Sequence, residues 1–516
     1  MTQEEPVWPH EFGVVIPDDE YNQTLMKNVH PPLWVNPAPS GKYNLVVIGA
    51  GTAGLVTASI AAALGAKVAM IERHLMGGDC LNVGCVPSKG IIRASRVWSD
   101  IRNAGEFGVS ALEAVRYDFG TVMERMRRVR ARISHVDSAD RYRKMGVDLF
   151  IGEGRFTGPS QIEVAGVPLH FLQAAICTGA RAAAPKIPGL KEAGYLTNET
   201  LFNLTQLPQR MAVIGGGPIG CEMAQCFARF GSDVALFEQG GHLLPREDTD
   251  AARIVQAQMM KEGVFIIFES KIIGITLRGG KKVIQYRENG EMKTSEVDEI
   301  LVGIGRAPNV EGLGLETVGV EYDAKGVKVN DKLQTTRSNI YAAGDVCFPY
   351  KFTHTADATA QIVIQNALFP HPFGLGYATT DSLVIPWCTY TDPEIASVGI
   401  NGVEASRRGV ETFTYPLNEV DRAILNGQEE GFARIHVQRG TDTILGATIV
   451  AAHAGELISP FTLAMRKGLG LGEIAGTIIP YPTQAEVVKK VANAWRKSAL
   501  TERKKKLLRR WFAFRR

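Results

Sequence analysis

The feature that most constrains the fold is a glycine-rich pattern that occurs twice. Residues 42–73 read as a buried strand, a glycine turn, an alanine-rich helix and a second strand, and residues 211–239 repeat this order. The repeat predicts two separate dinucleotide-binding folds in one chain. In each copy the first glycine precedes an acid by the same 23 residues, Gly49 before Glu72 and Gly215 before Glu238.

The first copy carries Gly49, Gly51 and Gly54 between a strand and a helix. Glycines at these positions let the backbone approach a pyrophosphate at the helix N-terminus. Glu72 can then accept hydrogen bonds from a ribose. The alternative is a glycine turn that only packs helix on strand.

The second copy carries Gly215, Gly217 and Gly220. Its acid, Glu238, repels a 2′-phosphate and therefore favours NADH over NADPH. No cation follows Glu238 directly, although Arg246 lies within reach of the same loop.

A chain of 516 residues predicts about three to four domains. No apolar run approaches the roughly 20 residues of a membrane span, and no signal segment opens the chain. Seven cysteines are too few for a disulfide framework, so we expect a reducing, cytoplasmic location. The basic stretch within residues 123–133 reads as a solvated helix face.

Cys80 and Cys85 lie five residues apart, in a predicted loop that enters a helix. A helix N-terminus lowers a thiol pKa and favours the reactive thiolate. Two unrelated buried thiols or half of a zinc site are the alternatives, but no further zinc ligands with matching spacing lie nearby. A redox pair is the favoured interpretation. Single cysteines elsewhere read as core residues: Cys221, Cys226, Cys347 and Cys388.

Together with GGDCLNVGCVPSKG, these motifs resemble the pyridine nucleotide–disulfide oxidoreductases of class I, in the branch of the mercuric reductases. The resemblance covers roughly residues 42–495. It implies that the first fingerprint binds FAD and the second binds NAD(P)H. Three shorter segments also match: CTGA (177–180), YAAGD (341–345) and TDPEIASVG (391–399).

The resemblance assigns the remaining site residues. Cys85 is the thiol next to the flavin, Cys80 meets the substrate, and Lys89 lies by the flavin with Glu222 as its ion-pair partner. Further FAD contacts are assigned to Gly78, Thr178, Gly179, Gly344 and Asp345, and a further NAD(P)H contact to Gly305.

The expected architecture is α/β, with two Rossmann-like dinucleotide-binding domains and a C-terminal α+β dimerisation domain that implies a homodimer. The expected segments are a Pro-rich acidic extension (1–40), the FAD domain (41–195 and 325–380), the NAD(P)H domain (196–324), the dimerisation domain (381–495) and a basic tail (496–516).

Tyr481 stands where disulfide-reducing members of the family carry a histidine, five residues before Glu486. A tyrosine, with an ordinary pKa of about 10, is a poor proton shuttle at neutral pH. This argues against glutathione or dihydrolipoamide as the efficient substrate. A soft metal ion needs thiolates rather than a general acid. We expect no permanent metal, and Cys80 and Cys85 are candidate transient ligands for such an ion.

Three hypotheses follow. The first is an NAD(P)H-dependent FAD enzyme that passes electrons through the dithiol to a soft metal ion, a quinone or a small disulfide. The second is a true mercuric reductase. Mercuric reductases carry a C-terminal cysteine pair that passes the metal inward, and no cysteine follows Cys388, which makes this hypothesis weaker. The third is a flavoprotein electron-transfer or redox-sensing partner at the inner face of the membrane.

The tail motivates the third hypothesis. Residues 496–516 hold ten Lys and Arg against one Glu, and Leu507, Leu508, Trp511 and Phe512 recur at helical spacing. Residues 501–516 are therefore expected either to contact a membrane or to dock on the protein beside its acidic leader. Nucleic acid is not an expected partner, because no base-reading motif accompanies the cations.

Overall fold

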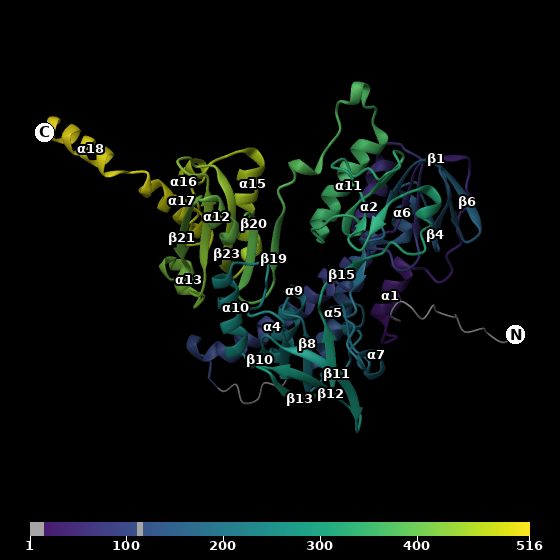
Figure 1. The fold of residues 1–516 in the computed structure, drawn as a ribbon, viewed down its shortest axis with the longest axis horizontal. Helices are drawn as coiled ribbons and strands as arrows, with labels where there is room; N and C mark the ends of the chain where they lie inside the picture. The colour runs from purple at the N-terminus through teal and green to yellow at the C-terminus, as the bar shows by residue number, and fades with distance from the viewer. Residues whose placement is uncertain (1–14, 111–116) are drawn as a thin grey trace. The chain divides into compact units, whose positions relative to one another are not determined.

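The structure is a computed structural model that describes residues 15–110 and 117–516 (Figure 1). It divides into two compact units. The first runs to Gly215 and includes Cys226–Phe237 and Ser270–Leu383. The second consists of Gly216–Gln225, Glu238–Glu269 and Val384–Arg516.

The first unit is built on a seven-stranded sheet in the order β3-β2-β1-β6-β5-β4, with β18 also paired to β6. Strands β1, β2, β3, β6 and β18 run parallel, whereas β4, β5 and β6 form an antiparallel meander. The strands are β1 (Lys42–Ile48), β2 (Val68–Glu72), β3 (Val147–Ile151), β4 (Gly154–Gly158), β5 (Gln161–Val164), β6 (Val167–Ile176) and β18 (Ile340–Ala342).

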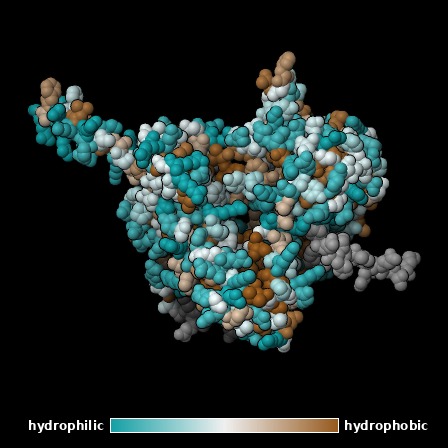
Figure 2. All heavy atoms as spheres, in the orientation of Figure 1, coloured by the Kyte–Doolittle hydropathy of each residue, from teal (hydrophilic) through white to brown (hydrophobic). Residues whose placement is uncertain are grey.

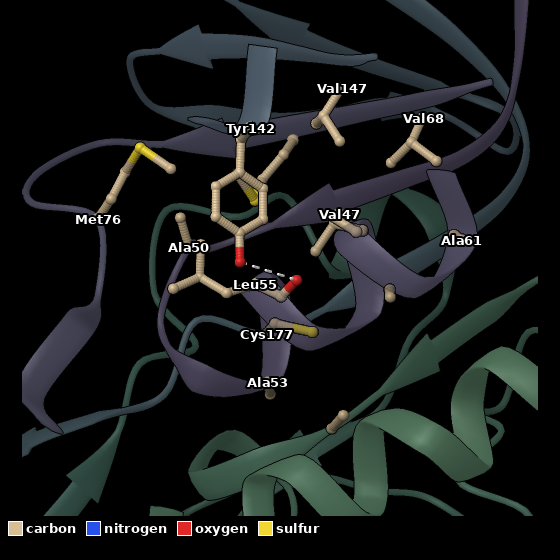
Figure 3. Close-up of a cluster of buried hydrophobic side chains, with 14 of the residues drawn as sticks. Val47, Ala50, Ala53, Leu55, Ala61, Val68, Met76, Tyr142, Val147 and Cys177 are labelled. Carbon is tan, nitrogen blue, oxygen red and sulfur yellow. Dashed lines mark hydrogen bonds between the residues drawn. The ribbon is translucent and has the colours of Figure 1, made fainter. Parts of the chain in front are cut away.

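Three helices pack against strands of this sheet: α2 (Thr52–Ala63), α6 (Ala139–Lys144) and α11 (Thr353–Leu368). Small residues on α2 allow close packing against apolar strands, which is how a parallel sheet buries its faces. Val47, Val68 and Val147 from three neighbouring strands meet this layer in one buried cluster (Figure 3). In Figure 3 the hydroxyl of Tyr142 donates to the carbonyl of Leu55 at 3.4 Å.

The second glycine pattern forms a second parallel arrangement, with β8 (Arg210–Ile214) between β9 (Asp233–Phe237) and β14 (Glu299–Val302). Helix α9 (Pro218–Phe230) connects β8 to β9. An antiparallel sheet of β11 (Lys271–Arg278), β12 (Lys281–Glu288) and β13 (Glu291–Val297) follows, and β7 (Ala180–Ala182) pairs with β15 (Arg306–Pro308).

The N-terminal segment was expected to extend from the body of the protein, but from residue 15 onward it packs against it. Residues 1–14 lie outside the described part. Helix α1 (Glu20–Val29) packs on α5 (Phe119–Ser134) and buries Leu25 and Val29 completely. These apolar side chains make α1 part of the core of the first unit.

The second unit carries an antiparallel sheet in the order β19-β20-β23-β22-β21. Its strands are β19 (Pro386–Thr389), β20 (Glu394–Gly399), β21 (Glu411–Pro416), β22 (Phe432–Val437) and β23 (Ile444–Ala451). Its helices include α10 (Thr249–Lys261), α12 (Gly402–Arg408), α13 (Asp421–Leu425), α14 (Ala454–Leu457), α15 (Ser459–Lys467), α16 (Leu471–Gly476), α17 (Glu486–Ser498) and α18 (Glu502–Phe514). The expected fold class is confirmed, while the domain boundaries stay predictions. Within the described residues, no helix combines the length and apolar character needed to cross a membrane.

Candidate active site

Cys80 and Cys85 lie on two consecutive helices of the first unit. Cys80 is in the short helix α3 (Gly78–Asn82), not in the expected loop, and Cys85 is the first residue of α4 (Cys85–Asn103). Cys85 is exposed and Cys80 is partly buried. Only Cys85 therefore occupies the helix N-terminus that favours a thiolate.

The surroundings of Cys80 make its thiol less acidic than an ordinary cysteine. The pKa of Cys80 is raised, first by its hydrogen bond to Cys85 and then by burial. A thiol that donates to its neighbour and is partly buried keeps its proton more firmly, so deprotonation of Cys80 is disfavoured. The expected lowering of the thiol pKa is therefore wrong for Cys80.

Thr353, which the sequence analysis missed, lies beside the dithiol. Its hydroxyl is 3.4 Å from the sulfur of Cys85, and it also lowers the pKa of Cys80 by a hydrogen bond. Thr353 is the first residue of α11. No motif spacing marks it, because it is far from the cysteines in sequence.

Lys89 lies one helical turn after Cys85, and both line a cleft of about 370 Å³ between α4 and α5. The cleft is lined by Cys85, Val86, Lys89, Gly90, Arg93, Arg125, Val129 and Ile133. Lys89 therefore lies on the same face of α4 as the thiol of Cys85.

Glu222 is on α9 and is buried, and its Oε1 accepts a hydrogen bond from the backbone N–H of Tyr390 at 2.9 Å. Glu222 is therefore not a solvated acid on an exposed face of the helix. Its ion pair with Lys89 stays a prediction, because the two residues belong to different units.

The first glycine turn forms a cradle that leaves no room for side chains. A Cβ on Gly49 would come within 2.4 Å of the Cys177 carbonyl oxygen, and one on Gly54 within 1.8 Å of the Gly49 carbonyl oxygen. A Cβ on Gly78 would come within 2.7 Å of the Gly51 Cα. The helix N-terminus at Gly51 has no side-chain cap. This cradle fits the pyrophosphate of FAD, and Gly78 joins it to the helix of Cys80.

The two acids of the repeated pattern make equivalent hydrogen bonds. Glu72 accepts from the backbone N–H of Ala50 at 2.6 Å and of His74 at 2.8 Å. Burial raises the pKa of Glu72, against the effect of these hydrogen bonds. Because a carboxylate has about four lone-pair sites, accepting capacity remains for a ribose hydroxyl.

Glu238 repeats this arrangement in the second unit. It accepts from Gly216 N–H and from Gly240 N–H, both at 2.7 Å. Arg246, the candidate 2′-phosphate partner, is exposed.

The glycines of the second glycine pattern, together with Gly305, have backbone conformations or free space that would let a dinucleotide approach the backbone closely. Gly215 has φ +107°, and its Cβ would come within 2.7 Å of the Gly303 carbonyl oxygen. A Cβ on Gly217 would meet open space, Gly220 is buried in α9, and Gly305 has φ +125°.

The remaining expected FAD contacts lie at the carboxyl ends of β6 and β18. The Thr178 hydroxyl donates to the Asn309 carbonyl at 2.7 Å, and Gly179 has φ +67°. Gly344, with φ +77°, would place a Cβ 3.1 Å from the Cβ of Ala53 on α2.

Asp345 and Asp79 share a cation that the sequence analysis missed. Arg306 forms an ion pair with Asp79, directly before Cys80, and its Nε lies 3.4 Å from Asp345 Oδ2. Burial raises the pKa of Asp345, while Arg306 opposes this shift. Arg306 thereby links the YAAGD segment (341–345) to the helix that carries Cys80.

Two arginines of α5 are buried, contrary to the expected solvated face. Arg127 forms an ion pair with Asp19 at 2.5 Å. Arg130 donates to Asn82, at the end of the Cys80 helix, and to Asn22 of α1. Burial lowers the pKa of Arg130 to about 10.

Tyr481 and Glu486 lie in the second unit. The Tyr481 hydroxyl donates to Asp421 Oδ2 at 3.0 Å, and this hydrogen bond raises the pKa of Tyr481. Tyr481 is 70% exposed. Glu486 opens α17.

The other cysteines lie mainly in packed surroundings. Cys221 and Cys226 are buried, as expected, and so is Cys177. Burial raises the pKa of Cys177 to about 12 and raises that of Cys347 as well. In the described part of the chain, no three His, Cys, Asp or Glu side chains gather as a metal site.

The family model of the pyridine nucleotide-disulphide oxidoreductases matches residues 43–361, and the model of the dimerisation domain of the same family matches residues 385–492. A mercuric reductase of Staphylococcus aureus is 35% identical over 455 residues, which cover 88% of this chain and 82% of the relative. A dihydrolipoyl dehydrogenase of Bacillus subtilis (strain 168) is 33% identical and is covered over 98% of its length, against 88% of this chain.

Among solved structures, the Cu(II) complex of the HOCl-induced flavoprotein disulfide reductase RclA from Escherichia coli superposes with a TM-score of 0.78. It is 27% identical, and the alignment covers 88% of this chain and 99% of that one.

Proposed function

Because the chain belongs to the class I pyridine nucleotide-disulfide oxidoreductases, an NAD(P)H-dependent flavoprotein family, we propose that it reduces a soft metal ion through Cys80 and Cys85. A quinone or a small disulfide is the next acceptor class. Electrons enter from NAD(P)H and leave through the substrate-facing thiol of Cys80.

One observation carries the choice of acceptor: the hydroxyl of Tyr481 is held by Asp421, which raises its pKa. A general acid works best with a pKa near the operating pH. The raised pKa of Tyr481 lies even further from that range. The chain therefore lacks, at this position, the proton donor that a leaving thiolate requires. Reduction of a metal ion requires no such donor.

The dithiol supplies what a soft metal ion needs. Cys85 opens helix α4, where the helix N-terminus favours a thiolate, and thiolates are preferred ligands of such ions. As the thiolate of Cys85 and the thiol of Cys80 become a disulfide, they release two electrons, to one Hg(II) or to two Cu(II) ions, and the single proton of Cys80 passes to solvent. The names of two similar proteins, a mercuric reductase and a reductase solved with Cu(II), support this class of acceptor.

FAD fits the first glycine cradle. Gly49, Gly51, Gly54 and Gly78 would admit its pyrophosphate, Glu72 would accept from its ribose, and Asp345 would bind its ribityl chain. When bound, it would supply two-electron transfer between the nicotinamide and the dithiol.

NADH is the proposed donor. Glu238 is fixed by two backbone N–H groups, so its carboxylate stays where a 2′-phosphate would be repelled. We also propose a homodimer, supported by the dimerisation-domain match, and a cytoplasmic location, because a working dithiol needs reducing surroundings.

An acceptor screen tests the proposal. Cu(II), Hg(II), a benzoquinone and lipoamide are offered with NADH and with NADPH, to the enzyme and to a Cys80→Ala variant. We expect metal-dependent NADH oxidation that the variant loses. Faster turnover of lipoamide than of either metal would contradict the proposal.

Mercuric reductase activity is the second candidate, favoured by the 35% identity to the Staphylococcus aureus enzyme. Mercury-dependent NAD(P)H oxidation in excess thiol separates it from general metal reduction. A rate no faster than that of Cys80→Ala would exclude it.

A further inference from the structure

Helix α18 (Glu502–Phe514) has two chemically different faces. At about 100° per residue, its large apolar side chains fall in one arc, whereas Arg503, Lys505, Lys506, Arg509 and Arg510 fall in the opposite arc. The apolar arc consists of Leu507, Leu508, Trp511, Phe512 and Phe514.

The apolar arc is exposed. Trp511 is 53% exposed, Phe512 58% and Phe514 85%, and Figure 2 shows apolar residues in brown on the surface of this segment. Within the described residues, no other element packs extensively against α18. An exposed cluster of this kind normally marks a binding surface.

The helix is an element separate from α17 (Glu486–Ser498). The Thr501 side chain accepts a hydrogen bond from Lys504 N–H, so Thr501 caps a new helix. Lys504 Nζ donates to the Ala499 carbonyl at 2.9 Å, which ties this cation to the end of α17. The apolar arc after the first turn therefore carries no cation before Arg515.

We propose that α18 binds the surface of a bilayer containing anionic lipids and lies in the interface plane. The aromatic and leucine side chains would enter the boundary between headgroups and acyl chains, and the opposite cations would meet lipid phosphates. Eight Lys and Arg against one Glu in residues 501–516 give the charge complementarity that this partner requires. The inference goes beyond the proposed function, since electron transfer through the dithiol does not require it.

Charge alone would also suit a nucleic acid, but it leaves the apolar arc unexplained. A second copy of the chain would explain the apolar arc but would bring like charges together. A bilayer surface with anionic headgroups can bind the cationic arc, and its acyl chains just below can bury the apolar arc, so it accounts for both.

Flotation of the full-length enzyme with vesicles tests the proposal. One set is pure phosphatidylcholine and the other contains phosphatidylglycerol as well. We expect flotation with the second set only, reduced about tenfold or more by removal of residues 501–516 or by high salt.

Matched substitutions separate the two faces. Leu507→Gln with Trp511→Gln keeps the charge and should abolish flotation, whereas Ala513→Gln, on the cationic arc, should preserve it. Lys506→Gln with Arg510→Gln should weaken flotation while leaving the apolar arc intact. All variants should oxidise NADH with a soluble acceptor as wild type does, which keeps this test independent of the acceptor.

Hydrogen exchange supplies a second measurement. The amides of α18 should exchange rapidly in the free enzyme and become protected by anionic vesicles. Protection without vesicles would mean that α18 docks on protein and would overturn the proposal, as would equal flotation of the shortened chain.

Discussion

The guanidinium of Arg130 donates a hydrogen bond to the carbonyl of Asn82 at 2.8 Å, at the end of the short helix that carries Cys80. Its second amino group donates to Asn22 of the N-terminal helix at 2.7 Å. The N-terminal extension therefore supports the dithiol helix through one buried arginine.

Arg130→Met should destabilise the first unit. It removes two charge-assisted hydrogen bonds and leaves a buried carbonyl without its donor, a loss of about 2–4 kcal/mol. The melting temperature and the temperature of flavin release should both fall. Arg132→Met, at an exposed position of the same helix, is the control, and equal melting temperatures for the two variants would contradict this role.

The pKa of Cys80 predicts the order of thiol modification. Because the pKa of Cys80 is raised and Cys85 is exposed at the start of helix α4, iodoacetamide at neutral pH should modify Cys85 first. The Cys85→Ala variant removes the hydrogen bond to Cys85, which is the largest cause of the raised pKa of Cys80. Modification of Cys80 should therefore begin at a lower pH in this variant. Peptide mass spectrometry across pH measures this, with Cys388→Ala as control. An unchanged pH dependence of Cys80 would refute the stated cause.

The same shift has a consequence for stability. The folded pKa of Cys80 lies above the unfolded value, so its contribution is complete below the ordinary thiol pKa. That contribution is lost as pH rises through the folded pKa. The reduced enzyme should therefore lose stability in alkaline solution relative to Cys80→Ala, as melting temperatures across this pH range would show.

The equivalent hydrogen bonds of Glu72 and Glu238 predict separable effects of the same substitution. Glu238→Gln should narrow the preference in kcat/KM for NADH over NADPH by about tenfold or more, the value of one charged hydrogen bond. FAD content should be unchanged. Glu72→Gln should weaken FAD retention and leave the NADH preference intact, so loss of FAD in both variants would contradict two separate sites.

Tyr481→His tests the missing general acid. A histidine titrates near pH 6.5, so the variant should gain lipoamide turnover by about a hundredfold. Tyr481→Phe should leave metal reduction unchanged. A loss of metal reduction in Tyr481→Phe would show instead that the hydroxyl takes part in the reaction.

The sequence predicted the strand, glycine turn, helix and second strand of both copies correctly, because each is set by short-range geometry. The spacing alone was enough to predict that Glu72 and Glu238 lie at the end of the second strand of each copy. The contributions of Thr353, Arg306 and Arg130 could not. Their partners lie far away in the chain, and a charge pattern does not show which arginines of a basic helix are buried.

The helix break at Thr501 shows another limit of the sequence. Apolar and basic periodicity continues on both sides of it, and only the cap at Thr501 shows that α18 begins anew. Cys80 illustrates the same point for chemistry, because the spacing located the dithiol but did not reveal which thiol keeps its proton.

Anaerobic reductive titration tests the central claim most directly, that electrons pass from NAD(P)H through flavin into the Cys80–Cys85 pair. The dithiol couple takes two electrons in addition to those of the flavin. We therefore predict twice the uptake of the flavin alone, with a long-wavelength charge-transfer band that disappears in Cys85→Ser. Uptake equal to that of the flavin alone, without the band, would contradict the account.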